Sequence, residues 1–250
     1  MARQKGIIKL KGTMGDITFY KSIDGYLARE KGGVEGSRIA SDPAFIRTRE
    51  NGAEFGNAAM AGKLLRDTVR SLSMNTADSR VTSRLTKLLA QIKNLDTTSK
   101  RGERTVAAGI ATAAGKLLLK GFNFNIKAPM GAVLHKALRL ATASGEIIID
   151  ELSPLNDISI PQGATHVILK TGYAVVDFAT GNTALAISNP TRLAVTPDTD
   201  DVDLCPPMPL PSIAGIKMMI LCIEFVQEVN GGDYSLKNGA YNVMNIVEVL

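Results

Sequence analysis

Tryptophan is absent from this chain of 250 residues, and aromatic residues make up only 5% of it. A protein that stacks nucleic-acid bases or sugar rings on its surface needs more rings than this. Cysteine is also scarce, with two residues, and two cysteines cannot build a disulfide framework. One bridge between Cys205 and Cys222 is left open by the sequence. Because Cys222 lies in the apolar run 218–226, we expect it to be a small core residue.

Long hydrophobic runs are missing as well. No segment reaches the roughly 18 uninterrupted apolar residues that a membrane span requires. Lys9 and Lys11 interrupt the first apolar stretch, so the N-terminus has no hydrophobic region of a signal peptide. We therefore expect a protein that is cytoplasmic as synthesised and has no membrane span, with release or leaderless export left open.

Recognisable catalytic motifs are not found either. The segment Gly109–Lys116 resembles a phosphate-binding loop, but five residues separate its glycines and Leu117 follows the lysine, where serine or threonine is required. It is better interpreted as a helix of small residues that packs closely on its neighbours. His135 and His166, the only two histidines, have no partner at metal-ligand spacing. We expect no enzymatic activity, and no catalytic residue, metal or cofactor.

An acidic cluster is the remaining candidate for a cation site. It is expected in a loop and comprises Asp198, Asp200, Asp201 and Asp203. Val202 and Pro209 stand where a calcium loop would need ligands, and no helices are expected on either side. We therefore interpret the cluster as a solvated loop, with a weak cation site as one alternative and a contact with the basic helices of a neighbouring copy as another.

Charge is distributed unevenly along the chain. Residues 1–120 hold 22 Lys and Arg against 11 Asp and Glu, whereas residues 121–250 hold 7 against 13. The first part therefore carries a net charge of +11 and the second a net charge of −6. Asymmetry of this kind bears on how copies or partners meet, not on the fold.

The N-terminal residues predict an extended β-arm followed by a linker, together covering residues 1–36. Apolar and polar residues alternate around Ile8, Leu10, Ile17 and Phe19, and Asp24-Gly25 is a strong hairpin signal. A Gly-rich segment follows at residues 30–36. Because few large hydrophobic residues are present, these strands cannot build a core alone and must pair with something else.

The middle of the chain, residues 41–120, predicts a small helical region. Ser41-Asp42-Pro43 is a good helix start, and the first helix is expected to reach about Leu72. Residues 81–92 carry one apolar stripe at helical spacing. A third helix of small residues is expected to end near Lys120.

Residues 121–250 predict a β-rich domain, because the apolar period changes to two and Gly, Pro and Asn interrupt it at short intervals. Asn230-Gly231-Gly232 marks the best hairpin. The expected strands are 122–127, 133–140, 146–150, 166–178, 184–188, 191–196, 218–229 and 243–250. The predicted class is therefore α+β, with a mostly antiparallel β-sandwich or barrel-like C-terminal domain.

Two stretches near the N-terminus resemble sequences of a known group. The first stretch contains the segments KGIIKLKGT, DITFYKS and GYLAREKGG, and the second contains DPAFIRTREN and EFG. They are similar to a group of uncharacterised proteins from the Bacteroidota. The similarity is dense over residues 1–70 and fainter at residues 122–125, 225–230 and 234–238. It implies a bacterial origin and a shared architecture of β-arm, helices and β-rich domain. It implies no catalytic residues.

Together these features predict a non-enzymatic structural protein that assembles into a homo-oligomer, a filament or a tube, by strand exchange through the arm. Copies are expected to meet head to tail, since the two parts of the chain have opposite charge. The predicted interface comprises Ile8, Leu10, Ile17, Phe19, Tyr20, Tyr26, Arg47, Arg49, Asp200 and Asp201. The alternatives are a nucleic-acid-associated protein that binds through the Arg- and Lys-rich helices, and a structural component of a phage or injection system.

Overall fold

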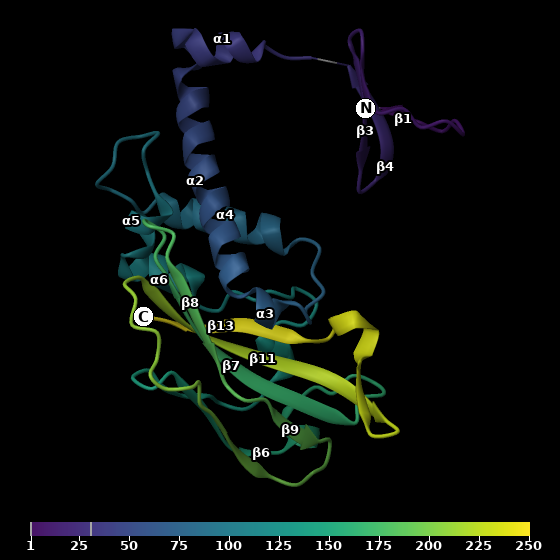
Figure 1. The fold of residues 1–250 in the computed structure, drawn as a ribbon, viewed down its shortest axis with the longest axis vertical. Coiled ribbons are helices and arrows are strands. Elements are labelled where there is room, and N and C mark those ends of the chain that lie inside the picture. The colour runs from purple at the N-terminus through teal and green to yellow at the C-terminus, as the bar shows by residue number, and fades with distance from the viewer. Residues whose placement is uncertain (1, 31) are drawn as a thin grey trace. The chain divides into compact units, whose positions relative to one another are not determined.

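The computed structural model describes residues 2–30 and 32–250 and contains two units, which divide after Arg49. Figure 1 shows the course of the chain through both. The first unit contains a four-stranded antiparallel sheet in the order β1-β4-β3-β2. Its strands are β1 (Ala2–Arg3), β2 (Gly12–Met14), β3 (Ile17–Ser22) and β4 (Gly25–Glu30).

Two-residue turns connect the last three of these strands. Gly15-Asp16 joins β2 to β3, and Gly15 has a φ of 55°, which glycine adopts without strain. Ile23-Asp24 joins β3 to β4, so the hairpin expected at Asp24-Gly25 is present. The expectation of a strand through Ile8 and Leu10 was wrong, because residues 4–11 form a loop instead.

Helical structure begins earlier than the sequence indicated. The segment expected to be a linker ends in α1 (Gly36–Ser41), which is followed by the 3-10 turn η1 (Pro43–Phe45) and by α2 (Ile46–Thr68). Asp42 caps η1, because its side chain accepts a hydrogen bond from Ala44 N at 2.9 Å. The helix start expected at Ser41-Asp42-Pro43 is therefore confirmed.

The second unit, Glu50–Leu250, takes up most of α2 and places the helices that follow it, up to residue 119, on one side of a large sheet (Figure 1). The single helix expected up to Leu72 is divided, because Val69 leaves the helical conformation. Thr112 likewise divides the third helix and caps its second part by accepting a hydrogen bond from Gly115 N. These helices are α3 (Arg70–Ser73), α4 (Val81–Lys93), α5 (Val106–Ile110) and α6 (Ala113–Leu119).

The large sheet has six antiparallel strands, of which β7 and β11 form the centre. β12, β11, β7 and β8 follow one another, while β13 also pairs with β11 and β9 with β7. The sheet consists of β7 (His166–Val176), β8 (Thr183–Ile187), β9 (Thr191–Ala194), β11 (Ile216–Val229), β12 (Gly232–Ser235) and β13 (Val243–Val249). The hairpin expected at Asn230-Gly231-Gly232 joins β11 to β12.

A smaller antiparallel sheet covers the other side of the large one. It has the order β10-β6-β5 and consists of β5 (Arg139–Ala141), β6 (Glu146–Leu152) and β10 (Asp200–Leu204). Short helical turns complete the unit: α7 (Met130–Val133), α8 (Pro154–Asp157) and η2 (Leu236–Gly239). The curled, antiparallel C-terminal part and the preceding helices confirm the α+β class and the barrel-like β-rich domain.

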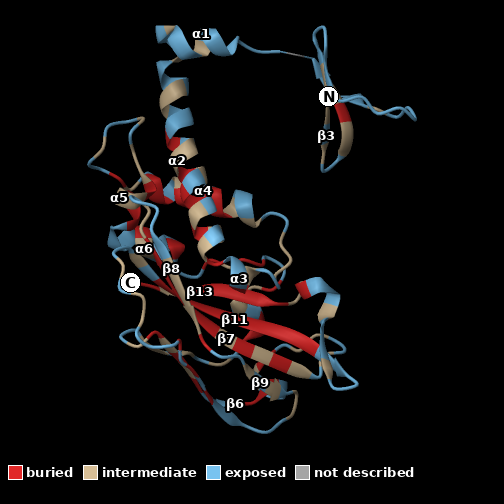
Figure 2. Cartoon of the chain, viewed as in Figure 1, coloured by how far each residue is buried: buried red, intermediate tan, exposed pale blue. Residues whose placement is uncertain are grey.

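The central part of β11, residues 218–226, is buried on both faces, and Figure 2 shows most of this strand in red. Met218, Ile220 and Cys222 face the helices in one hydrophobic cluster. Met219, Leu221 and the alternate residues after them face the smaller sheet in a second cluster. A strand covered on both sides has no polar face, which explains why the residues from Met218 to Ile223 are all apolar.

Three segments of this unit differ from the expectation. Residues 122–127 make only an isolated bridge, between Asn123 and Asn245, and residues 133–140 are divided between α7, a connection and β5. The acidic segment expected to be a loop contains strand β10, in which Val202 and Leu204 are buried while Asp201 and Asp203, the residues that alternate with them, are exposed.

The small residues expected to allow close helix packing do so. A Cβ atom on Gly109 would lie 2.0 Å from the carbonyl oxygen of Ile92, and one on Gly115 would lie 2.2 Å from the carbonyl oxygen of Gly109. Both distances are far below van der Waals contact. The interpretation of residues 109–116 as a packed helical segment is therefore confirmed. Among the residues that the structure describes, no helix is long and apolar enough to cross a membrane.

An ionic cluster fastens α2 to the rest of the second unit. The buried carboxylate of Glu54 pairs with Lys93 of α4 and with Arg104, and it also accepts a hydrogen bond from Gly102 N at 2.7 Å. Burial raises the pKa of Glu54, but the hydrogen bonds from Lys93 and Gly102 and the charges of Lys93 and Arg104 outweigh it and hold the pKa below its usual value.

Candidate assembly interface

The strand register divides the side chains of the N-terminal sheet between two faces. Phe19 lies opposite Ala28, Lys21 opposite Tyr26, and Ile17 opposite Glu30. Directly opposed residues of an antiparallel pair lie on the same face. With the neighbouring strands included, this arrangement gathers one set of apolar residues, here called the apolar face: Ala2, Met14, Ile17, Phe19, Tyr26 and Ala28.

The opposite face of this sheet is polar. The guanidinium of Arg29 lies 5.5 Å from the centre of the Tyr20 ring, and the buried Leu27 lies opposite Tyr20 on β3 and Arg3 on β1. Leu27 is the only buried residue within residues 2–30 and 32–49. The other members of this face are Arg3, Thr13, Thr18 and Ser22.

Among the described residues, the apolar face is covered only in part by its own unit. Met14 is 65% exposed and Ile17 is 46% exposed, and Figure 2 shows these strands mostly in pale blue and tan, with one red segment. A sheet needs a buried hydrophobic face to be stable in water. Large exposed apolar surfaces on a folded protein mark sites of interaction. The apolar face of this sheet is therefore a candidate site of contact with another protein surface.

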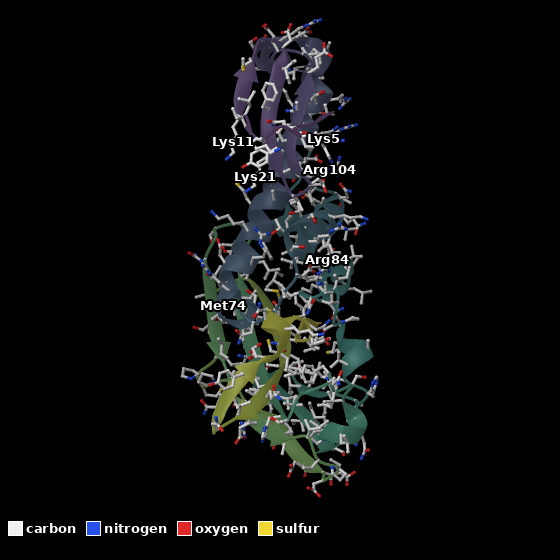
Figure 3. All side chains as sticks on the ribbon, turned by 90° about the vertical axis from the view of Figure 1, so that its right-hand side faces the viewer. Lys5, Lys11, Lys21, Met74, Arg84 and Arg104 are labelled. Carbon is white, nitrogen blue, oxygen red and sulfur yellow. The ribbon has the colours of Figure 1, made fainter. Side chains whose placement is uncertain are left out.

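Hydrogen bonds of the Gln4 side chain stabilise the loop that joins β1 to β2. The Gln4 side-chain amide donates to Leu10 O at 3.2 Å and to Leu27 O at 3.1 Å, while Leu10 N donates to Gln4 Oε1 at 2.8 Å. The loop presents Ile7 and Ile8, which are 102% and 81% exposed. Lysines accompany it, and Figure 3 labels Lys5, Lys11 and Lys21 on this unit. These local hydrogen bonds are the reason that residues 4–11 do not continue as a strand.

The structure brings only some of the predicted N-terminal residues together. Ile17, Phe19 and Tyr26 share the apolar face, whereas Tyr20 lies on the polar one. Ile8 and Leu10 lie in the loop over residues 4–11 instead. Three further residues of the apolar face, Ala2, Met14 and Ala28, were not predicted. The period of two and the Asp24-Gly25 turn were sufficient to place Ala28 opposite Phe19.

The predicted arginines lie where α2 begins. Arg49 Nη1 donates to Ile39 O at 2.7 Å and to Asp42 O at 3.0 Å, so its side chain ties α1 and η1 to α2. Arg47 also interacts within the chain. Their contribution to an interface stays a prediction.

The predicted aspartates lie in the second unit. Asp200 and Asp201 are exposed on β10, an edge strand of the smaller sheet. Asp201 Oδ1 accepts a hydrogen bond from Glu151 N at 2.8 Å, which fixes one side chain of the acidic edge.

One group of potential metal ligands is found among the described residues, comprising His166, Glu228 and Asp233. Arg192 already occupies it. Its Nε and Nη2 donate to the two oxygens of Asp233 at 3.0 and 2.9 Å, and Nη2 also donates to Glu228. The hydrogen bonds that Arg192 donates to Asp233 and Glu228 raise the pKa of its guanidinium. A metal ion would have to displace this guanidinium, so the cluster is an ion-pair network.

Neither cysteine is paired. Cys205 is exposed and donates from Sγ to Glu146 Oε1 at 2.7 Å, which with partial burial raises its pKa to about 11. Burial raises the pKa of Cys222 to about 12. Both thiols are therefore protonated near neutral pH and are weak nucleophiles. The bridge that the sequence left open is not formed, and Cys222 is a core residue as expected.

No model of a known protein family, no curated protein and no solved structure matches this chain. The apolar face of the N-terminal sheet is therefore the feature of this chain that bears most directly on function.

Proposed function

We propose that this protein is a non-enzymatic structural protein that assembles into a homo-oligomer, a filament or a tube, through its N-terminal sheet. The apolar face carries the proposal, because it exposes Met14 and Ile17 while its unit buries only Leu27 among the described residues. Burying that face against another copy supplies the hydrophobic cover that the unit lacks.

Sheet edges support strand exchange between copies. β1 and β2 are the outer strands of the N-terminal sheet, and both are short and exposed. Unpaired edge strands accept or donate a further strand through their backbone hydrogen-bonding groups. β10 is an edge of the smaller sheet in the second unit, so it offers a place where a strand from a neighbouring copy can add.

Charge supports a contact between the arm of one copy and β10 of the next. Residues 2–30 carry Arg3, Lys5, Lys9, Lys11, Lys21 and Arg29 against Asp16, Asp24 and Glu30. β10 carries Asp200, Asp201 and Asp203. Opposite charges favour the head-to-tail encounter and disfavour pairing of β10 with a second β10.

The basic helices offer less support for the alternative, a nucleic-acid-associated protein. Arg84 pairs with Asp78, Lys93 and Arg104 pair with Glu54, and Arg101 pairs with Glu50. Cations that already neutralise carboxylates within the chain gain less by binding phosphates. A component of a phage or injection system remains an alternative form of the same structural role.

Deletion of residues 1–36 tests the proposal. The deleted protein is expected to remain monomeric in light scattering, while its circular dichroism and urea unfolding show that the second unit is folded. Electron microscopy of the full chain is expected to show particles that the deleted protein does not form. Assembly of the deleted protein to the same size would contradict strand exchange through the arm.

Nucleic-acid binding is measured in parallel. Affinity of the full chain for nonspecific DNA that falls linearly with salt on a log–log plot would favour the alternative.

A further inference from the structure

Charge is arranged in opposite signs at the two ends of the apolar face. At one end, Lys21 Nζ lies 5.8 Å and Lys9 Nζ 6.0 Å from the centre of the Tyr26 ring. At the other end, Glu30 lies opposite Ile17, and Asp16 immediately precedes it in the connecting turn. Phe19 and Ala28 form the row between the two ends. The face is therefore apolar in the middle, positive at one end and negative at the other.

A surface with this pattern is complementary to a second copy of itself when a 180° rotation relates the two copies. The rotation axis lies between the stacked faces and runs across the strands, along the Phe19–Ala28 row. The rotation places the cations of one copy on the carboxylates of the other, at both ends of the contact. Stacking two copies without this reversal would place Lys21 against Lys21 and Glu30 against Glu30, which is repulsive. A two-fold contact of this kind is isologous, so every contact between two different residues occurs twice, once in each direction.

We propose that two copies of this chain stack their apolar faces about a two-fold axis at the Phe19–Ala28 row, with Lys21 of each copy paired to Glu30 of the other. The inference rests on the proposed self-assembly and names the surface and the geometry that one of its contacts uses. It is separate from strand exchange, since stacking buries the face of the sheet and leaves its edges free.

The shape of the face agrees with this arrangement. A hollow of about 580 Å³ lies at its acidic end and is lined by Ala2, Asp16, Ile17, Ala28, Arg29 and Glu30. The reversed orientation brings the Lys21 and Tyr26 end of the partner to this hollow.

Within the described residues, neither Lys21 nor Glu30 forms an ion pair in its own chain. Both charges are available to a partner.

Charge reversal in the full chain tests the geometry. Lys21→Glu and Glu30→Lys each place like charges together at both ends of the contact, so each is expected to weaken self-association at least about tenfold in sedimentation velocity. Mixing the two variants, or combining both changes in one chain, restores opposite charges at both ends and is expected to restore association. Lys127→Glu makes the same change of net charge as Lys21→Glu, and Glu103→Lys the same change as Glu30→Lys. Both positions are exposed in the second unit, outside the proposed contacts, so these variants are the matched controls.

A cysteine cross-link provides a second measurement that does not depend on charge. In a Cys205→Ser background, Ala28→Cys lies near the proposed axis. A short bismaleimide is expected to link it to the same cysteine of the second copy, because the faces of stacked sheets lie about 10 Å apart, too far for a direct disulfide. Thr18→Cys lies on the polar face and is expected to cross-link far less.

The outcomes separate this inference from the proposed function. A wild-type chain that stays monomeric contradicts self-assembly itself. A wild-type chain that associates, with single variants that associate equally well or a mixture that does not recover, contradicts the two-fold stacking alone. Equal cross-linking of Ala28→Cys and Thr18→Cys would contradict it as well.

Discussion

Phe19 of β3 lies directly opposite Ala28 of β4, and the two form the middle row of the apolar face. Neither residue belongs to the hydrophobic clusters of the second unit. A change at Phe19 should therefore affect association without affecting the stability of that unit.

The first prediction follows from this separation. Phe19→Ser is expected to weaken self-association by about 2–3 kcal/mol, roughly 30- to 150-fold, because it removes a large apolar side chain from the buried centre of the contact. Sedimentation velocity measures the association, and urea unfolding of the second unit provides the check on folding. Thr18→Ala, on the polar face of the same strand, is the control. Equal association of Phe19→Ser and wild type would show that this face is not an interface.

The second prediction concerns the buried ion pair between Glu54 and Lys93. Glu54→Gln leaves the ammonium of Lys93 buried without its carboxylate, so it is expected to lower the free energy of unfolding by about 3–5 kcal/mol. Urea denaturation followed by circular dichroism measures this change. Asp67→Asn removes an exposed carboxylate from the same helix and is expected to change stability by about 0.5 kcal/mol or less. A similar small effect of Glu54→Gln would show that the pair does not stabilise the fold.

The third prediction is a loss of stability in acid. Burial raises the pKa values of Glu54 and Asp78, but the hydrogen bonds and cations around each outweigh it, so both lie below their ordinary values. The pKa of Asp96 is also lowered, chiefly by its hydrogen bonds with Ser99 and Thr105. Because these carboxylates bind protons less readily in the folded chain, their stabilisation is full above about pH 4.5 and is lost as the pH falls through the depressed folded-state values.

Urea unfolding between neutral pH and pH 3 measures this dependence. The free energy of unfolding is expected to fall steadily below about pH 4.5, and to fall less steeply in Glu54→Gln, which lacks one of the three carboxylates. Stability that stays constant or increases toward pH 3 would contradict the assignment.

The fourth prediction compares two glycines in helices. Gly109→Ala places a methyl group 2.0 Å from Ile92 O and is expected to cost at least about 1–3 kcal/mol of stability. Gly52→Ala, in α2, has no atom within 4 Å of the added carbon and is expected to stabilise the chain by about 0.5–1 kcal/mol. Thermal unfolding should therefore shift in opposite directions for the two variants, and shifts of the same sign would contradict the packing at Gly109.

The large sheet could be predicted from the sequence because local patterns determine it. The apolar run of β11 and the Asn230-Gly231 turn are both visible in a short window, and each appears in the structure where expected. Strand β10 could not be predicted, because aspartates dominate its short sequence. Only its pairing with β6 in the smaller sheet shows that Val202 and Leu204 are buried. Tertiary contacts determine a strand of this kind.

The candidate interface could be predicted only in part. The alternation around Ile17 and Phe19 indicated an apolar face, and the turn at Asp24-Gly25 was sufficient to place Ala28 on it. The loop over residues 4–11 depends on hydrogen bonds between Gln4 and backbone groups at Leu10 and Leu27, which no local pattern reveals. The opposite charges at the two ends of the apolar face became visible only when the register paired Glu30 with Ile17.

Self-assembly of the full chain is the central claim, and its mass in solution tests it most directly. Sedimentation velocity over a range of micromolar concentrations is expected to show species at multiples of the 26.6 kDa chain mass, with the larger ones increasing with concentration. A single species of 26.6 kDa at every concentration and at low salt would contradict the account.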